Sequence, residues 1–332
     1  MTIANTLLAR RSTRLGALAL LLLVVYATLP ALFGGNLYLM SVFIAALTIG
    51  GVALAWSLLG NLGGLVSFGH AAFFGVGSYA SALLVMKAHW PVPLAMAAAG
   101  VCAALAAVLI LPALRLTGAY FALAVLAYAH VFRIIATEWS SLTGGAAGIG
   151  SIPRLPSFLG FELGSKAGTY WTGLTLVLMF TLIYWRIRES DRGLALRAMQ
   201  RSEQATRMVG VNSLWLKSLM LFLSAFMTGM MGAFNAHAIG FLEPDYAFSG
   251  LWTMLPIVAA IFGGYRSIGG PLVGAVVVYL LDQLLFKEIM PIGHQIVLGA
   301  LLVLMILCSP DGLVPLLLRR TRHALGLRSA HA

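Results

Sequence analysis

The sequence predicts an all-α polytopic membrane protein with about ten transmembrane helices. Hydrophobic residues make up 61% of its 332 positions and charged residues only 9%, whereas a soluble domain carries roughly 25% charged residues. Apolar runs of about 20 residues, the length that a spanning helix needs, recur along most of the chain. Because a backbone in hydrocarbon must satisfy its own hydrogen bonds, we expect these runs to be helices.

Charged residues and Gly/Pro breaks divide a transmembrane domain, 15–309, into ten predicted spans. A basic N-terminus, 1–14, precedes the first span, which lacks a convincing cleavage site and is therefore interpreted as a retained helix and not as a signal peptide. A basic tail, 310–332, follows the last span. The predicted spans are 15–33, 37–59, 65–86, 92–112, 118–137, 168–186, 216–239, 250–264, 270–286 and 291–309.

Basic residues predict the orientation of these spans. Lys and Arg collect in cytoplasmic loops because they resist translocation. Both termini and the segment 187–215 with its flanks are basic, so all three are expected in the cytoplasm, whereas the loop 138–167 is poor in arginine and is expected on the outer face. The three basic clusters are Arg10, Arg11 and Arg14; Arg186, Arg188, Arg192, Arg197, Arg201, Arg207 and Lys217; and Arg319, Arg320, Arg322 and Arg328.

The distribution of chemically reactive residues disfavours several classes of protein. Histidines and the two cysteines, Cys102 and Cys308, are scattered singly, so no catalytic residue, metal site or disulfide is expected. Only Asp282 is a passable candidate for the buried carboxylate that a proton or sodium symporter usually keeps. No Gly-x-x-x-x-Gly-Lys-Ser/Thr phosphate loop occurs, so this chain is expected to bind no cofactor. Topology explains the net charge of +11, which favours membrane lipid over nucleic acid as the partner of the arginines.

A glycine-rich break between the second and third spans supplies candidates for a translocation pathway. Such backbone survives at membrane depth only when it is buried in protein or faces a water-filled cavity, so we expect a broken glycine-rich helix. His70 either lines the pathway or forms a hydrogen bond between helices, and Gly75 and Gly77 either line it or permit close helix packing. In the outer loop, either free backbone amides meet a polar substrate or the segment is an ordinary flexible loop. The candidates from the break, the third span and the outer loop are Asn61, Ser67, His70, Tyr79, Thr143, Gly144 and Gly145.

The pattern Gly-Gly-x-x-Ser-x-Gly occurs at residues 63–69 and again at 263–269. Both copies lie at predicted turns, the second of them cytoplasmic. Chance is a serious explanation in a chain with 36 glycines, so the recurrence is only a hint of an internal repeat.

The basic segment 187–215 combines arginines with apolar residues in an amphipathic pattern. This pattern is typical of short helices that lie along a membrane surface, with Asp191 as the expected N-cap. The string 201–212 resembles the cytoplasmic coupling segment of the permeases of branched-chain amino acid ABC importers, Glu-x-Ala-Ala, three residues, then Gly-Ile-Asn. The matching residues are Glu203, Ala205, Gly210 and Asn212, with Thr206 in place of the second alanine.

Other strings resemble the same family in the same order, over roughly residues 40 to 315. The length and the long outer loop favour the M-type permease, which in that family pairs with a second, shorter permease. Tyr265–Arg266 departs from the usual Leu-Gly and places bulk and charge where it would alter packing against the partner or an inner gate. The matching strings are Leu65–Gly75, Leu116–Leu123, Leu142–Gly145, Leu223–Phe226 with Gly229 and Gly232–Ala233, Pro244–Asp245, Gly263–Gly264, Gly269–Pro271 and Pro310–Leu313.

The resemblance implies a multi-pass permease of the bacterial inner membrane. Its implied partners are a second homologous permease, two ABC ATPase subunits that use ATP and Mg, and a periplasmic substrate-binding protein. Arg201 and the four matching residues form the implied ATPase-coupling set, in which Glu203 would make a polar contact with an ATPase groove and Gly210 would allow the chain to turn back. Tyr120 joins the candidate pathway residues. The substrate stays open among branched-chain amino acids, other amino acids and amides such as urea, and so does the choice between a homodimer and a heterodimer of permeases. The alternatives are a secondary transporter or channel for a small polar solute such as urea or an amide, and a membrane enzyme.

Overall fold

A computed structural model describes residues 28–316, apart from 29, 31, 117, 159, 291, 309–311 and 315. The predicted first span, 15–33, lies almost entirely outside these residues, as does most of the basic tail. The elements in chain order are α2 (Leu37–Ser57), η1 (Leu58–Leu62), α3 (His70–Ala88), α4 (Val92–Ala106), η2 (Ala107–Arg115), α5 (Ala119–Glu138), α6 (Ser140–Thr143), η3 (Gly145–Ala147), β1 (Ser157–Phe158), β2 (Phe161–Glu162), α7 (Lys166–Arg188), α8 (Asp191–Arg201), α9 (Glu203–Met208), α10 (Ser213–Ile239), α11 (Pro244–Ala247), α12 (Leu251–Gly263), α13 (Gly270–Leu281), η4 (Asp282–Phe286), α14 (Lys287–Ile289) and α15 (His294–Cys308).

Seven helices in the described part of the chain are long and apolar enough to cross a membrane. They correspond to the second to eighth predicted spans, so the all-helical membrane fold is confirmed, but the count of ten is not. At the ninth predicted position, α13 continues through the π-helical turn η4 into α14, where charged residues begin to accumulate. At the tenth, α15 has 15 residues, fewer than the roughly 20 that a span needs. The seven helices are Leu37–Leu62, His70–Ala88, Val92–Arg115, Ala119–Glu138, Lys166–Arg188, Ser213–Ile239 and Pro244–Gly263.

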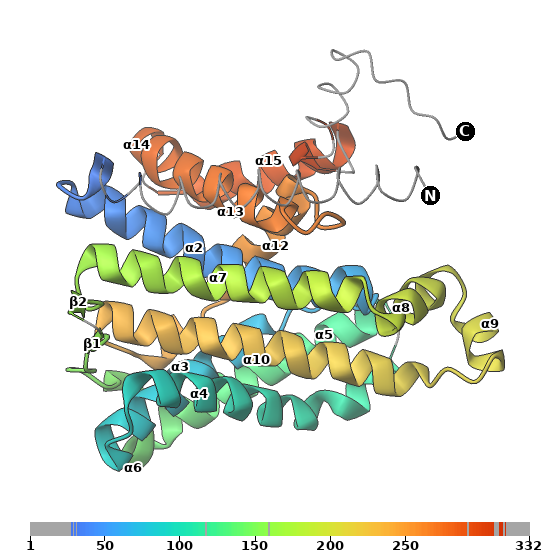
Figure 1. Ribbon diagram of the computed structural model, residues 1–332, viewed down its shortest axis with the longest axis horizontal. Helices are drawn as coiled ribbons and strands as arrows, with labels where there is room; N and C mark the ends of the chain where they lie inside the picture. The colour runs from blue at the N-terminus through green and yellow to red at the C-terminus, as the bar shows by residue number, and fades with distance from the viewer. Residues whose placement is uncertain are drawn as a thin grey trace, which may run out of the picture.

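Helices α2 and α10 lie at the centre of the bundle (Figure 1). Helix α2 contacts α7, α10, α12 and α13, and α10 contacts α3 and α4. Helix α2 is apolar on all sides, as expected of a helix that other helices surround. The β1–β2 hairpin and α6 lie at one end of the bundle and α8 and α9 at the opposite end, with α7 and α10 running between the two ends (Figure 1).

Glycine allows α10 to approach α3 and α4 more closely than any other residue would. A Cβ atom at Gly77 of α3 would lie 2.2 Å from the carbonyl oxygen of Gly229 in α10, and a Cβ at Gly229 would lie 2.4 Å from Cβ of Ala103 in α4. A Cβ at Gly232 would lie 2.1 Å from the carbonyl oxygen of Phe74. Small residues at helix crossings are a general feature of membrane bundles, so Gly77 occupies a packing position.

The glycine-rich break connects two separate helices, and the broken helix that the sequence predicted there is not confirmed. Helix α2 ends in η1, the backbone from Gly63 to Gly69 is non-helical, and α3 begins at His70. The second copy of the pattern connects α12 to α13 in the same way. In each copy the second glycine has a positive φ angle, +68° at Gly64 and +100° at Gly264. The two strings therefore share a structural context as well as a sequence pattern.

We predict that Gly77→Ala lowers the thermal stability of the purified protein, because the added methyl group overlaps the backbone of α10. Overpacking of a tight core typically costs about 1–3 kcal/mol, and backbone on the other side cannot rotate away as a side chain can. The matched control is Gly299→Ala in α15, where a Cβ meets nothing within 4 Å. Thermal unfolding in detergent, followed by size-exclusion chromatography, measures both variants. Equal apparent Tm values for the two would contradict the close contact.

Candidate functional site

Two short helices, α8 and α9, form the projection that the coupling-segment pattern predicted. Helix α8 begins one residue earlier than expected, at Asp191, because Ser190 and not Asp191 is the N-cap: its hydroxyl oxygen accepts from the backbone N–H of Gly193 at 3.3 Å. Ser202 separates the two helices with an extended backbone, φ −158° and ψ 103°, and caps α9 by accepting from the N–H of Ala205 at 3.3 Å. Arg201 is the exposed last residue of α8.

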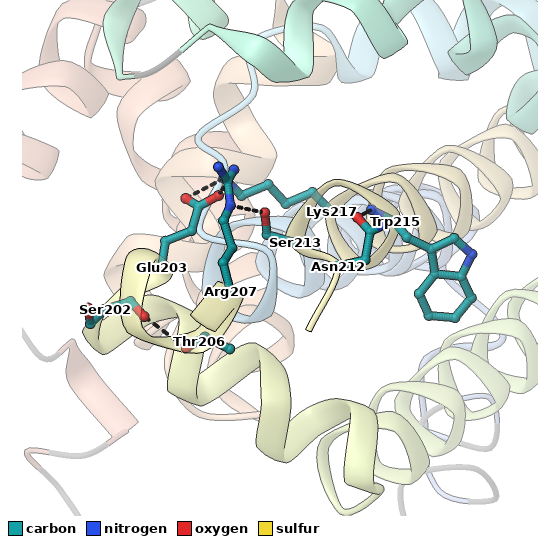
Figure 2. A network of polar contacts seen from close by, with 8 residues as sticks. All are labelled: Ser202, Glu203, Thr206, Arg207, Asn212, Ser213, Trp215 and Lys217. Atoms are coloured by element: carbon teal, nitrogen blue, oxygen red, sulfur yellow. Dashed lines mark hydrogen bonds and ion pairs between the residues drawn. The ribbon is translucent and has the colours of Figure 1, made fainter. Parts of the chain in front are cut away.

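Glu203 joins α9 to the first turns of α10. Its two carboxylate oxygens accept from different cations, Oε1 from Arg207 at 2.6 Å and Oε2 from Lys217 at 2.8 Å. Arg207 also donates from Nε to the hydroxyl of Ser213 at 2.7 Å. Figure 2 shows the cationic ends of Arg207 and Lys217 converging on the carboxylate of Glu203, with Arg207 also reaching Ser213 at the start of α10. The hydrogen bond from Lys217 is the main cause that holds the pKa of Glu203 below its usual range, with Arg207 adding to it and partial burial opposing it.

The turn after α9 presents apolar side chains to the outside. Met208 is 89% exposed and Val209 is 79% exposed. Gly210 follows with φ +88°, a conformation that favours glycine, and a Cβ there would meet nothing within 4 Å. The positive φ angle, and not a lack of space, therefore restricts which residues can replace Gly210. A groove of about 450 Å³ runs between α8 and α9, lined by residues that include Leu194, Ala205 and Val209.

Asn212 starts α10 as its N-cap. Its side-chain oxygen accepts from the backbone N–H of Trp215 at 3.0 Å, which satisfies one of the free amides of the helix start. The guanidinium of Arg192 lies 5.4 Å from the centroid of the Trp215 ring, within the range of a cation–π contact between α8 and α10. The predicted coupling residues thus occupy one projection, in which Glu203, Ala205 and Asn212 hold the local structure.

The candidate pathway residues near the glycine-rich break bind other helices. Asn61 donates from Nδ2 to the hydroxyl of Tyr184 in α7 at 2.8 Å and to the carbonyl oxygen of Arg266 at 3.3 Å. His70 is fully buried, and its Nε2 lies 2.9 Å from the hydroxyl of Ser224. Ser224 in turn donates to the carbonyl oxygen of Ala55 at 2.8 Å. His70 therefore connects α3 with α10 and, through Ser224, with α2. This agrees with the interpretation that His70 forms a hydrogen bond between helices.

The next three candidate pathway residues, Ser67, Tyr79 and Tyr120, do not form one site together. Ser67 is buried, and its hydroxyl oxygen accepts from the N–H of Gly69 at 3.2 Å. The ring of Tyr79 stacks on that of Phe248, with centroids 6.0 Å apart. Tyr120 lies near the start of α5 and is 73% exposed.

Thr143, Gly144 and Gly145 form a turn at the hairpin end of the bundle. The hydroxyl of Thr143 donates to the carbonyl oxygen of Ala136 at 2.6 Å, and φ is +78° at Gly144 and +61° at Gly145. The segment that follows pairs with α10's C-terminal extension through the bridge between Ile149 and Leu242. These contacts connect the turn to α5 and to the segment after α10.

A cavity of about 470 Å³ lies between α2, α7, α10, α12 and η4, and none of the candidate pathway residues lines it. Its polar lining includes Asn235, Tyr246, Asp282 and His294. Tyr246 donates to Oδ1 of Asn235 at 2.9 Å. Apart from Asp282, these residues were not predicted from the sequence, because they are single polar residues in separate apolar runs. The signal that was present is the charge of Asp282 inside a predicted span.

Comparisons with known proteins point to transport. The family model described as branched-chain amino acid transport system / permease component matches residues 38–306. The high-affinity branched-chain amino acid transport system permease protein LivM of Salmonella typhimurium is 28% identical over 308 residues, 85% of this chain and 70% of the relative, and LivM of Escherichia coli gives the same figures. The permease protein LivH of Salmonella typhimurium is 22% identical over 290 residues, 79% of this chain and 90% of the relative. No solved structure gives a significant match.

We predict that the attachment of α9 to α10 weakens at acidic pH. Because the folded-state pKa of Glu203 is lowered, its charge contributes fully above the unfolded value of about 4.3 and this contribution is lost as pH falls through the lower folded-state value. Amide hydrogen exchange in 203–213, corrected for intrinsic rates, should therefore rise below about pH 4 in the wild type. In Glu203→Gln, exchange should be raised already at pH 7 and change little with pH. Glu162→Gln in β2 is the control, and a Glu203→Gln profile that matches the wild type would contradict the prediction.

Proposed function

This chain belongs to the family of permease components of branched-chain amino acid transport systems, and we propose that it is a transmembrane permease subunit of an ABC importer. In this proposal it forms a translocation path with a second, homologous permease. A periplasmic binding protein delivers the substrate, and two separate ATPase subunits supply the energy from ATP and Mg. The relatives with known roles are transport permeases and not enzymes.

The observation that carries this proposal is the α8–α9 projection with its exposed apolar tip. Met208 and Val209 are exposed at the end of a segment that is otherwise rich in arginine. Exposed apolar residues with a polar rim are typical of a protein–protein contact. The ion pairs of Glu203 fix α9 to α10, so a movement of the tip would reach a central helix of the bundle. An ATPase groove is the partner that the family provides for such a segment.

The proposed orientation places α8 and α9 in the cytoplasm of a bacterial inner membrane. The support is the density of basic residues in and around α8 and α9, because such residues resist translocation. The β1–β2 hairpin and α6 lie at the other end of the bundle (Figure 1), which is then the periplasmic side. With the spans predicted at 15–33, 270–286 and 291–309, the chain has ten spans and both termini in the cytoplasm.

Branched-chain amino acids are the proposed substrates, because the matching permeases of Salmonella typhimurium and Escherichia coli are named for them. The test is uptake of radiolabelled L-leucine, L-valine and urea by proteoliposomes that contain the complete complex and internal ATP. We expect ATP-dependent uptake of leucine or valine in the presence of the binding protein. Uptake of urea alone would overturn the substrate assignment.

A secondary transporter or channel is the second candidate, and the buried Asp282 is the observation that favours it. An ion-coupled carrier usually keeps an intramembrane carboxylate for its driving ion. The two candidates differ in their energy source. Uptake that a protonophore abolishes and that does not require ATP would favour the second candidate over the first.

We predict that Glu203→Lys and Gly210→Leu each uncouple the ATPases from transport. The lysine would face Arg207 and Lys217 and repel both, and the leucine would strain the turn at φ +88° by about 1–2 kcal/mol. A coupling free energy of 1–3 kcal/mol corresponds to roughly 5- to 150-fold, so leucine uptake and ATPase stimulation by the loaded binding protein should both fall at least about tenfold.

Two control variants match these changes at positions away from the projection. Glu162→Lys in β2 makes the same charge change at the other end of the bundle, and Gly299→Leu makes the same glycine substitution in α15, where a Cβ meets nothing within 4 Å. Both controls should keep the uptake and the ATPase stimulation of the wild type. Wild-type leucine uptake and ATPase stimulation in both Glu203→Lys and Gly210→Leu would contradict the proposed docking role of α9.

A further inference from the structure

We propose that the cavity between α2, α7, α10 and η4 binds an α-amino acid in transit, with Asp282 as the contact for its ammonium group. The inference rests on the proposed function, because it names the place in the permease where a substrate amino acid binds. It follows from the state of the Asp282 carboxylate, the lining of the cavity and the position of the cavity in the bundle.

Asp282 is a buried carboxylate with an unmatched oxygen. The residue is 3% exposed, and Oδ1 has no hydrogen-bond partner among the described residues. Nε2 of His294 lies 3.8 Å from Oδ1, beyond hydrogen-bond distance, and Oδ2 accepts only a long bond of 3.3 Å from Gln283. Leaving a buried acceptor unpaired costs free energy, more so for a charged group. A primary ammonium brings three donors and would satisfy this oxygen.

The backbone around Asp282 also departs from the regular helix. Asp282 is the first residue of η4, a π-helical turn between α13 and α14. Such turns are rare and occur frequently at functional sites. A buried carboxylate oxygen without a hydrogen-bond partner and an irregular turn both reduce the stability of the fold, so neither is explained by packing alone.

The rest of the lining fits the other groups of an amino acid. Lys166 is the first residue of α7 and lines the cavity. Lys287 of α14 also lines the cavity, so two cationic side chains border it that would attract the carboxylate of an amino acid. Ile44, Ile49 and Leu255 provide an apolar wall for an aliphatic side chain. The volume of about 470 Å³ is within the range of roughly 300–1,000 Å³ for small-molecule sites.

The cavity lies in the half of the bundle that is farther from α8 and α9. Its lining comes from the start of α7, which follows the hairpin, and from the last turns of α10, at Asn235 and Ile239. In the proposed orientation this half faces the periplasm. A site there receives the amino acid directly from a binding protein, before any movement of the α8–α9 end.

The first test is leucine uptake by the complete complex with Asp282→Asn, which keeps the shape of the side chain and removes its charge. We expect uptake to fall at least about tenfold, the scale of a lost charge-assisted hydrogen bond, with ATPase stimulation by the loaded binding protein retained. Glu288→Gln in α14 is the matched control, because Glu288 is exposed and does not line the cavity, and it should behave as the wild type. Uptake by Asp282→Asn within about twofold of the wild type would overturn the site.

The second test measures occupancy directly and does not require transport. In the complex with Cys102 and Cys308 replaced by alanine, Ala238→Cys places a thiol in the cavity lining. L-leucine should slow its reaction with a methanethiosulfonate reagent, whereas 4-methylpentanoate, which has the same side chain and no ammonium group, should not. Equal protection by both compounds, or protection by neither, would contradict the assignment. This test does not use Asp282→Asn, so it remains valid if that variant proves unstable. If the wild-type complex takes up no amino acid while leucine still protects, the proposed function fails and the site remains.

Discussion

The close contact of α10 with α3 and α4 is the constraint on which the rest of the structure depends. Gly77, Gly229 and Gly232 bring the three backbones together, and His70 and Ser224 fix the same helices by hydrogen bonds. Within a membrane the hydrophobic effect does not drive helices together, so van der Waals packing and interhelical hydrogen bonds must hold them in contact. These contacts therefore hold α10 against α3 and α4.

Helix α10 connects the two proposed functional regions of the molecule. Lys217 binds Glu203 at one end, and Asn235 lines the cavity near the other end. Asn235 follows Lys217 by 18 positions along the helix, which corresponds to about 27 Å at a rise of roughly 1.5 Å per residue. A displacement of α9 that pulls on Lys217 therefore acts on an element that also borders the cavity. This arrangement gives a direct physical connection between the proposed ATPase-docking surface and the proposed substrate site.

Composition and local pattern predicted the fold class and the α8–α9 projection, because both depend on features within short windows of sequence. The i, i+4 spacing of Glu203 and Arg207 was visible in the same way, although its role was not noticed. Lys217 follows Glu203 only after a turn whose geometry depends on Gly210, so its pairing was not predictable from spacing. The cavity was not predictable either: Asn235, Asp282 and the other polar residues of its lining come from distant helices, and only packing brings them together.

The strength with which α9 is held also matters for its role. The side chains of Glu203 and Arg207 are 34% and 57% exposed, and that of Lys217 is 15% exposed. Exposed ion pairs contribute about 0–1 kcal/mol each, so the pair with Lys217 is the stronger attachment and that with Arg207 adds little. Helix α9 has only 6 residues, too short to be stable alone. It is therefore ordered enough to present Met208 and Val209 as a defined surface, yet held weakly enough to adjust when a partner covers that surface.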